Sequence, residues 1–477
     1  MKFSIVVDRM QYGVGQGGFH CQQIAVKTDN SKVQIEPYRF VYDCGSDTGE
    51  FKKGQTKPLE WAIRHFAGRM RSNAAKPKLV VNALYLSHFQ KDHIDGALRL
   101  AQFVDLREIV IPHITAEQFS HIVAQQVSTG DIASMDQKTQ RYLQVLQSAA
   151  SGDGSVIGNV PTTRVPSDGE TPDAPSASGN NAPLPTPEGQ EPTRGEQDKG
   201  PGDLPEGAYE IRDAMRPSGQ WQHRISRLLH VGQAGRNAPD MLNFWEMRVW
   251  SYAQSLALSN SVVQELGKLE VSPGNPALPR LIAGKVDISE ITWAIKNRVK
   301  IQNAYKKALK LHKVTAAHDH NVVSLCLHSG PAQMKAFSVC CERWHASFPF
   351  EFDSWLLGSS FGWVGTGDAL LAGVDAWAGF KRHFSQGHDR LLEWLTVLMP
   401  HHGSGSGGNF NAGLLGTGMR FAVFSAGAFN KYGHPSRNVL DTVVDSRARA
   451  VVVTEYARPG FFEHLTYSVS PRDWFSL

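Results

Sequence analysis

No apolar run in the sequence approaches the roughly 18 residues that a membrane-spanning helix needs. The five cysteines form no C-x-x-C pair and no even set for disulfide bonds, which favours a reducing compartment. Lysine and arginine number 49 against 45 acidic residues, so the net charge alone does not indicate a nucleic-acid partner. We therefore expect a cytoplasmic protein without a membrane partner, whose 477 residues suffice for a large core and two or three domains.

One stretch concentrates side chains that bind metals. Residues 86–96 read L-S-H-F-Q-K-D-H-I-D-G and begin at the end of an apolar run that is typical of a buried strand. Alternate side chains of an extended segment point the same way, so His88, Gln90 and Asp92 can converge, and His93 joins them if a helix begins there. Imidazole and carboxylate groups packed this closely suit zinc, manganese or iron. The alternative is a polar loop with two incidental histidines.

The spacing H-F-Q-K-D-H resembles the signature H-x-H-x-D-H of the metallo-β-lactamase superfamily, with Gln90 at the usual second histidine. Other pieces follow in the family's order and look most similar to the metallo-β-lactamase-like domain of the competence protein ComEC. They are V-G-Q-G-G at 14–18, F-V-Y-D-C-G at 40–45, G-T-G-D at 365–368, P-H-H-G-S at 400–404 and S-A-G-x-x-N-x-Y-G-H-P at 425–435. The chain lacks the membrane spans of ComEC itself, so we interpret it as a soluble relative.

The resemblance implies an α/β fold, a four-layer αβ/βα sandwich whose halves are residues 1–120 and 321–477. A long, mostly helical insertion is expected at 121–320, between the halves. Within it, residues 151–207 are dominated by Pro, Gly, Ser, Thr and acidic residues, and this segment cannot bury enough apolar surface to offset the entropy of ordering. We predict a disordered tether there and a helical part at about 211–315.

The helical part is predicted from apolar spacing. Apolar residues three and four positions apart indicate one helix over 240–266, namely Leu242, Trp245, Val249, Tyr252 and Leu256. A second apolar stripe begins at Ile288 and ends at Leu309. The opposite face of this second helix carries Lys296, Arg298, Lys300, Lys306, Lys307, Lys310 and Lys313. Such a face is usually only solvated, but it can also line a phosphate path or bind a protein partner.

The resemblance further implies two divalent metal ions, zinc or manganese. One site would use His88, Gln90 and a third-motif residue. The other site would use Asp92, His93 and the histidine turn, His401 and His402. Asp368, at the end of an apolar strand, would bridge both ions.

Two further assignments concern Asp43 and the third-motif ligand. Asp43 is expected to orient ligand side chains rather than to bind metal. The third-motif ligand stays open among His318, His320 and His113, of which His113 follows a predicted strand and is more typical of a rim residue.

We assign catalytic roles to Asp92, His434, Asn430 and Tyr432. His434 lies in G-H-P, where the resemblance implies a pocket position suited to stabilising an oxyanion or protonating a leaving group; the alternative is a structural histidine in a turn. The predicted activity is metal-dependent hydrolysis of a phosphodiester, including nucleic acid, by a metal-activated water. The alternatives are hydrolysis of another ester or amide, and a degenerate binding or scaffold module, which Gln90 motivates.

Overall fold

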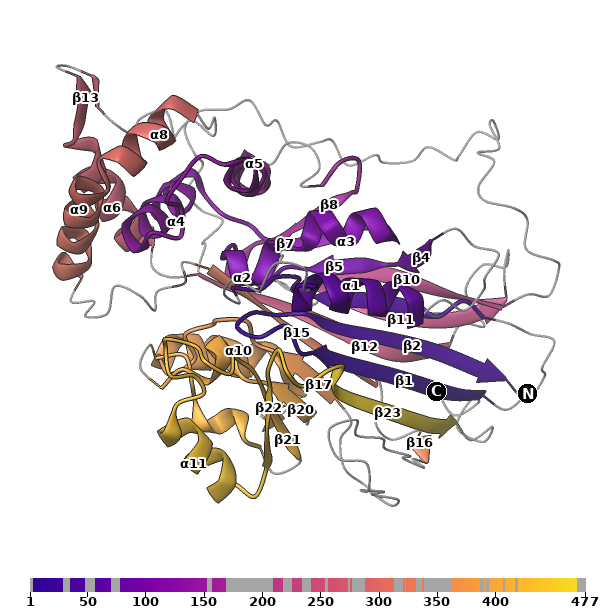
Figure 1. Cartoon of the computed structure of the whole chain (residues 1–477). Coiled ribbons are helices and arrows are strands. Elements are labelled where there is room, and N and C mark those ends of the chain that lie inside the picture. The colour runs from indigo at the N-terminus through magenta and orange to yellow at the C-terminus, as the bar shows by residue number, and fades with distance from the viewer. Residues whose placement is uncertain are drawn as a thin grey trace, which may run out of the picture.

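The fold contains two large β-sheets and helices along their outer faces (Figure 1). The computed structural model describes residues 3–28, 35–47, 56–69, 78–151, 157–168, 209–217, 225–233, 242–253, 256–272, 275–276, 288–312, 321, 323–331, 337–338, 362–386, 390–391, 394–405, 408–416 and 419–469. The predicted α/β class is confirmed. Among the helices that the structure describes, none has the length and apolar character needed to cross a membrane.

The first sheet has the strand order β16-β23-β1-β2-β3-β5-β7-β8. Its strands are β1 (Phe3–Tyr12), β2 (His20–Thr28), β3 (Tyr38–Tyr42), β5 (Ala83–Tyr85), β7 (Ile109–Pro112), β8 (Thr162–Val165), β16 (Phe337–Ser338) and β23 (Gly460–Val469). Neighbours from β16 to β3 pair antiparallel, whereas β3, β5, β7 and β8 pair parallel. The carboxyl ends of β3, β5 and β7 therefore meet at one edge.

The second sheet has the order β10-β11-β12-β15-β17-β20-β21-β22, with β9 paired to β12 beside this path. Its strands are β9 (Ser167–Asp168), β10 (Tyr209–Pro217), β11 (Ile225–Gln233), β12 (Leu242–Ala253), β15 (Val323–Pro331), β17 (Gly362–Gly365), β20 (Trp394–Leu398), β21 (Phe421–Ser425) and β22 (Arg449–Val453). The last four strands pair parallel. Their carboxyl ends also share one edge.

Short strands form three separate two-stranded sheets. The pairs are β4 (Leu79–Val81) with β6 (Val104–Leu106), β13 (Glu270–Ser272) with β14 (Asn275–Pro276), and β18 (Ser385–Gln386) with β19 (Arg390–Leu391). The single turns of 3₁₀ helix are η2 (Pro400–Gly403) and η3 (Ala412–Leu414). The turn η2 follows β20 and contains His401 and His402.

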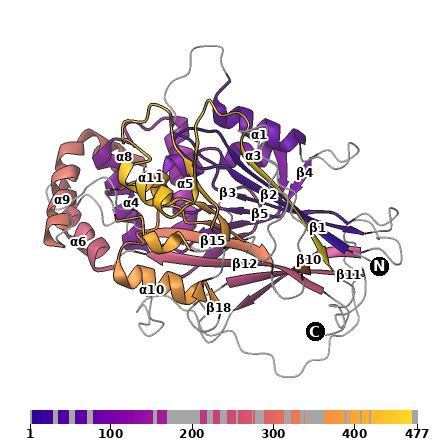
Figure 2. The same cartoon turned by 90° about the horizontal axis from the view of Figure 1, so that it is seen from below.

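The two large sheets share one apolar core. Tyr85 and Phe40 of the first sheet belong to the same buried cluster as Trp245, Leu327 and Trp363 of the second. A second cluster joins the first sheet to α1 (Pro58–Arg69), α3 (Ala97–Phe103), α4 (Ala116–Thr129), α5 (Gln137–Ser151), α6 (Leu256–Gly267), α8 (Ile288–Lys296) and α9 (Arg298–Leu311). A third joins the second sheet to α10 (Val374–His383) and α11 (Arg437–Asp445), and Figure 2 shows α10 beside β12.

The helix predicted over 240–266 is wrong for its first half. Residues Leu242–Ala253 form β12, and the helix α6 begins only at Leu256. The reason is that β12 is covered on both faces: Trp245 and Val249 face the core between the sheets, while Trp250 belongs to the cluster with α10. When a strand has apolar side chains on both faces, some of them are three or four positions apart, as they are on one face of a helix.

The described residues of the predicted insertion form strands as well as helices, which corrects the prediction of a helical part at 211–315. Strands β10, β11 and β12 extend the second sheet, and β8 extends the first. The predicted tether over 151–207 is likewise wrong at its start, because Thr162–Val165 pair with β7 and Ser167–Asp168 pair with β12. Residues 169–208 lie outside the described part of the chain.

The second predicted helix is present as two helices that meet at Asn297. Ile288–Lys296 form α8, and Arg298–Leu311 form α9, with Ile301, Tyr305 and Leu309 buried. The basic residues from Lys296 to Lys310 are exposed; Lys313 lies outside the described residues. Lys307 pairs with Glu265 of α6 at 2.9 Å, so part of the basic face serves contacts within the protein.

Candidate metal centre

The candidate metal centre lies where the carboxyl ends of parallel strands from both sheets meet. The loop after each strand contributes polar side chains: Asp43 after β3, His88 to His93 after β5, Asp368 after β17, His401 and His402 after β20, and His434 after β21. Strands from opposite sides of the apolar core thus bring together His88 with Asp368 and Asp92 with His402, residues that are 280 and 310 positions apart. This convergence is the usual location of sites in sheets with parallel strands.

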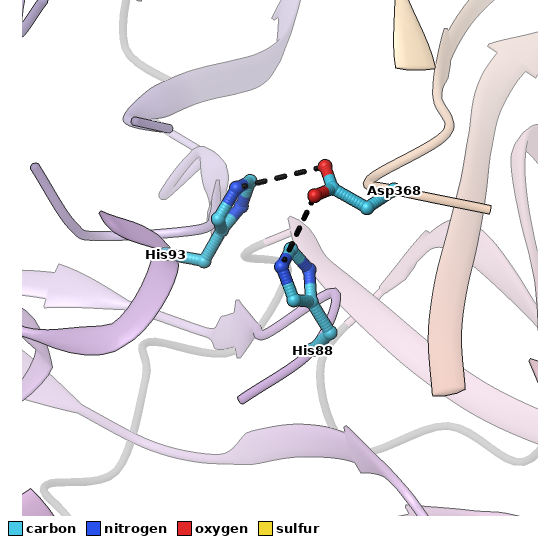
Figure 3. A group of neighbouring side chains, drawn as sticks. All are labelled: His88, His93 and Asp368. Carbon is cyan, nitrogen blue, oxygen red and sulfur yellow. Dashed lines mark ion pairs between the residues drawn. The ribbon is translucent and has the colours of Figure 1, made fainter. Parts of the chain in front are cut away.

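A sealed group of three side chains occupies the interior of this edge (Figure 3). Nε2 of His88 lies 3.5 Å from Oδ2 of Asp368, and Nε2 of His93 lies 3.7 Å from Oδ1 of the same carboxylate. All three side chains are buried. The two oxygens of Asp368 therefore face different imidazoles.

A second group shares His93 and opens toward a cavity. Oδ2 of Asp92 lies 3.7 Å from Nε2 of His93 and 3.2 Å from Nε2 of His402. Asp92 is only partly buried, with 14% of its side chain exposed. His401 stands between the groups, because its Nε2 lies 3.7 Å from Oδ2 of Asp368. We call the first set the sealed group and the set of Asp92, His93 and His402 the open group.

The Nδ1 atoms of the four histidines are all held by neighbouring oxygens. His402 donates from Nδ1 to the Ser425 carbonyl at 2.6 Å, and His401 donates to Oδ1 of Asn409 at 3.0 Å. His93 donates to Oδ2 of Asp43 at 2.8 Å. An Nδ1–H bond of this kind fixes the ring and leaves Nε2 available as a metal ligand.

Ser87 settles the orientation of the fourth ring, His88. The Ser87 hydroxyl donates to Oδ2 of Asp43 at 2.8 Å. Because its proton is used there, the Ser87 Oγ accepts a hydrogen bond from Nδ1 of His88 at 2.9 Å. The Ser87 backbone N–H also donates to Oδ1 of Asp43 at 2.7 Å. Asp43 thus lies behind the imidazoles and holds two of them, directly or through Ser87, and does not belong to either donor group.

The backbone around the centre is strained and closely packed. Asp43, His401 and His402 have φ of 58°, 46° and 55°, in the left-handed region that non-glycine residues rarely adopt. Gly45 allows the loop after β3 to pass against the helical turn α2 (Lys91–Ile94), since a Cβ on Gly45 would lie 2.4 Å from backbone atoms of Asp92 and His93. The Cys44 N–H donates to the His93 carbonyl there at 2.7 Å.

The sealed group contains buried polar atoms that face one another but make no hydrogen bond. Among the described residues, Nε2 of His88, Nε2 of His93 and Oδ1 of Asp368 are buried without a hydrogen-bond partner. Leaving several such atoms unpaired in one place is costly unless another species binds them. These three converging atoms fit a divalent cation, which accepts imidazole nitrogen and carboxylate oxygen as ligands.

The charges in the centre are strongly coupled. Burial and the neighbouring His93 lower the pKa of His88 to about 4, so this imidazole is neutral. Burial also favours the neutral form of His93, but the surrounding carboxylates outweigh it and raise the pKa of His93 to about 10. Against the effect of burial, the imidazoles hold the pKa values of Asp92 and Asp368 well below their usual range.

The donor set is therefore nitrogen and oxygen, with ionised carboxylates, which suits zinc or manganese. No protein-family model matches the chain, and no curated protein matches it. The donor atoms and their surroundings consequently carry the assignment of the centre.

Several residues of the centre were missed by the sequence analysis. Asn321 donates from Nδ2 to Oδ2 of Asp368 at 2.6 Å, and Asn409 donates to the Asp368 backbone carbonyl at 2.8 Å. Ser87, beside the central motif, could have been found from its adjacency to His88. Asn321 follows the predicted candidates His318 and His320 directly, but both of these lie outside the described residues.

The structure describes the surroundings of two further predicted residues, Gln90 and His113. Gln90 is half-buried and begins α2 without a capping hydrogen bond from its side chain, and it faces the cavity beside Asp92. His113 follows β7, where its backbone N–H donates to the Val165 carbonyl, and it belongs to neither donor group.

A cavity of about 600 Å³ lies over the open group. Its lining comprises Gln16, Asp47, Gln90, Lys91, Asp92, Gln126, Thr129, Gly130, Asp131, His401, Lys431, Tyr432 and His434. This volume is in the range of sites for small ligands. The contact with Tyr432 and the carboxylates of Asp47 and Asp131 raise the pKa of Lys431, so it stays an ammonium.

The loop after β21 supplies the predicted catalytic residues at this cavity. The His434 ring stacks on Tyr432 with centroids 5.8 Å apart and lies 5.4 Å from the ring of His401. Asn430 accepts from the His434 N–H at 2.9 Å and donates to the His434 carbonyl at 2.7 Å. Asn430 therefore shapes the turn that presents His434, while His434 and Tyr432 face the cavity.

Proposed function

We propose that the two sheets and their outer helices form the four-layer αβ/βα sandwich of the metallo-β-lactamase superfamily. Support comes from the apolar core shared by the sheets and from the separate helical clusters on their outer faces. The order of the six sequence motifs agrees with this proposal, since each motif lies at the end of a strand on the same edge.

We infer that the protein is a metal-dependent hydrolase. The observation that carries this inference is the convergence of Nε2 of His88, Nε2 of His93 and Oδ1 of Asp368, three buried atoms that make no hydrogen bond with any described residue. His402 and Asp92 complete a second set beside the cavity. A divalent ion bound to such donors supplies a water whose pKa is near neutral, and this water is a nucleophile for hydrolysis.

The chain's own groups bind and orient the substrate. Lys91 and Lys431 bring two cationic side chains to a cavity that Asp47, Asp92 and Asp131 also line, and these two ammonium groups are suited to bind the anionic oxygens of a phosphodiester. His434 lies beside His401 at the cavity wall, so it can donate a proton to the leaving oxygen or hydrogen-bond the developing charge. Tyr432 stacks on His434 and restricts its orientation.

The test combines metal content with hydrolysis. We expect purified protein to retain zinc or manganese and to hydrolyse bis(p-nitrophenyl) phosphate faster than p-nitrophenyl acetate. The variant with Asp92→Ala and His93→Ala should lose both the metal and hydrolysis while its circular dichroism stays native.

The matched control is His113→Ala, which removes a nearby imidazole outside both donor groups and should keep its metal. Metal content unchanged in the double variant would show that the assignment is wrong. Preferred hydrolysis of the acetate would favour the alternative substrate class, another ester or amide.

A further inference from the structure

The middle of the chain builds a helical cluster against the metal centre. We call α4, α5, α6 and α9 the helical cluster; these helices gather at one end of the molecule in Figure 1. Val127 of α4, Leu146 of α5, Leu266 of α6 and Leu309 of α9 are buried in the same apolar cluster as the first sheet. The position of the helical cluster is therefore fixed relative to the strand ends.

Two helices of this cluster hydrogen-bond to the loop that carries the metal motif. Nε2 of Gln126, on α4, donates to the Phe89 carbonyl at 3.0 Å. The hydroxyl of Tyr142, on α5, donates to the same carbonyl. The Phe89 carbonyl belongs to the peptide that joins Phe89 to Gln90, so both bonds hold the loop between His88 and Asp92.

The donors are suited to a permanent role. Gln126 is buried, and burial raises the pKa of Tyr142, which keeps its hydroxyl protonated and able to donate. A carbonyl oxygen has two lone pairs, so the Phe89 carbonyl is fully satisfied by the two donors together. The Phe89 ring is itself buried in the apolar cluster, which fixes the other end of the residue.

The same helical cluster forms a wall of the cavity. Gln126, Thr129, Gly130 and Asp131, at the end of α4, line it. Arg298 of α9 holds this end: its Nη2 donates to the Thr129 carbonyl at 2.8 Å and to the Ser128 carbonyl at 3.2 Å. Gly130 has φ of 93°, and a Cβ there would lie 2.7 Å from the guanidinium, so the arginine packs directly on the wall.

We propose that Gln126 and Tyr142 are positioning residues for the metal loop, and that Arg298 is a positioning residue for the cavity wall. The helical cluster is then part of the site and not an appended module. This inference rests on the proposed metal site. The inference goes beyond the proposed function, because it assigns metal affinity to contacts made by α4 and α5 and substrate affinity to the contact made by α9.

The first test measures metal affinity and does not depend on hydrolysis. Gln126→Met and Tyr142→Phe each remove one donor without a large change in shape, and the double variant removes both. Loss of an outer partner of a metal ligand typically costs about 10- to 100-fold in metal affinity. We expect each single variant to lose about tenfold or less, and the double variant to lose more than the product of the singles, because only then is the carbonyl left without a partner.

A matched control lies on the same helix. Gln118 is also buried on α4, but its side chain accepts from the Thr115 N–H at the opposite end of the helix, away from the loop. Gln118→Met should lower the melting temperature and leave metal affinity unchanged, as measured by competition with a chromogenic chelator.

The outcomes separate the inference from the proposed function. Wild-type metal affinity in the Gln126→Met/Tyr142→Phe double variant would overturn the inference and leave the metal site standing. Wild-type protein that binds neither zinc nor manganese would overturn both. Metal binding that weakens as expected, in a protein without hydrolysis, would support the inference and count against the proposed activity.

The second test concerns the wall. Arg298→Ala should raise KM for bis(p-nitrophenyl) phosphate several-fold while metal affinity and kcat stay near wild type, because Arg298 touches the wall and not the donor groups. Arg298→Lys keeps the charge but loses the forked hydrogen bonds, so positioning predicts a KM like that of Arg298→Ala. A wild-type KM for Arg298→Lys would assign the effect to charge and overturn the positioning role.

Discussion

The sealed group and the open group share the His93 imidazole but differ in their contact with solvent. His88 and Asp368 are almost fully buried, whereas Asp92 is partly exposed and lines the cavity. Within the described part of the chain, the sealed group has three atoms without a hydrogen bond, while in the open group Oδ2 of Asp92 lies 3.2 Å from Nε2 of His402. The two groups therefore contain the same kinds of ligand but differ in burial and in access to the cavity.

We propose that this difference assigns the sealed group to metal binding and the open group to turnover. A sealed group exchanges its ligands slowly and has no room for substrate, so it is suited to holding charge in place. The open group faces the cavity with Lys431 and His434, where a substrate can enter. His93 couples the two groups, because its ring nitrogen lies 3.7 Å from carboxylate oxygens of both.

The largest effect is expected from His93→Ala, because this change removes the ligand common to both groups. Nε2 of His93 can bind one ion at a time, so at least one ion per chain should be lost, and hydrolysis should fall to background. Inductively coupled plasma mass spectrometry of the purified variant checks the metal content. Metal content equal to that of the wild type would show that His93 is not a ligand.

The sequence predicted those residues of the centre that lie close together in the chain. His88, Asp92 and His93 follow one strand within six residues, and His401 and His402 follow another, so each set is placed by its strand end. These patterns predicted the α/β class and the common edge. They could not divide the ligands into a sealed and an open group, since burial depends on which loops cover each side chain.

The contacts that sequence analysis missed are made by short polar side chains and by backbone atoms. Ser87, Asn321 and Asn409 are residue types that are common in any loop, and their partners lie far along the chain. The contact of Gln126 with the Phe89 carbonyl involves a main-chain oxygen, which carries no signal in the sequence. β12 was mistaken for a helix because both of its faces are apolar.

A second prediction separates the groups by charge. Asp368→Asn keeps the shape of the sealed group but removes the negative charge that faces His88 and His93. We expect the ion of the sealed group to be lost and the ion of the open group to be retained. Metal affinity in the sealed group should fall by more than the about 10- to 100-fold cost of losing an outer partner.

The matched change on the other side is His402→Gln, which removes a ligand of the open group only. It should retain the ion of the sealed group and abolish hydrolysis. Equal metal contents and equal residual activities in Asp368→Asn and His402→Gln would show that the groups are not distinct.

A smaller effect is expected behind the centre. Asp43→Asn keeps a residue type that tolerates the left-handed backbone at φ 58°, but it weakens the acceptor for Nδ1 of His93. The amide can also present a donor to Nδ1, which would place the ring proton on Nε2 and block ligation. We expect metal affinity to fall about 10- to 100-fold in a folded protein. Unchanged affinity in a chelator competition would contradict the role of Asp43 in holding the ring.

The smallest change, and the sharpest test of the comparison, is Gln90→His. Gln90 occupies the position where the superfamily signature has a histidine, and its amide oxygen is a neutral and poorer ligand for zinc than imidazole. We therefore expect asymmetry in the wild-type protein: the ion of the open group binds first, and the site that uses His88 and Gln90 binds weakly or prefers manganese.

The structure allows this substitution without a change of fold. Gln90 begins α2 with extended backbone angles, makes no capping hydrogen bond with its side chain and lines the cavity beside Asp92. An imidazole of similar size should therefore reach the same space and raise the zinc affinity of the weaker site, while the melting temperature of metal-free protein stays the same. Calorimetric titration of zinc into metal-free wild-type and Gln90→His protein measures both sites. Two equally tight sites in the wild type would refute the asymmetry, and no binding to either protein would favour the degenerate scaffold over the hydrolase.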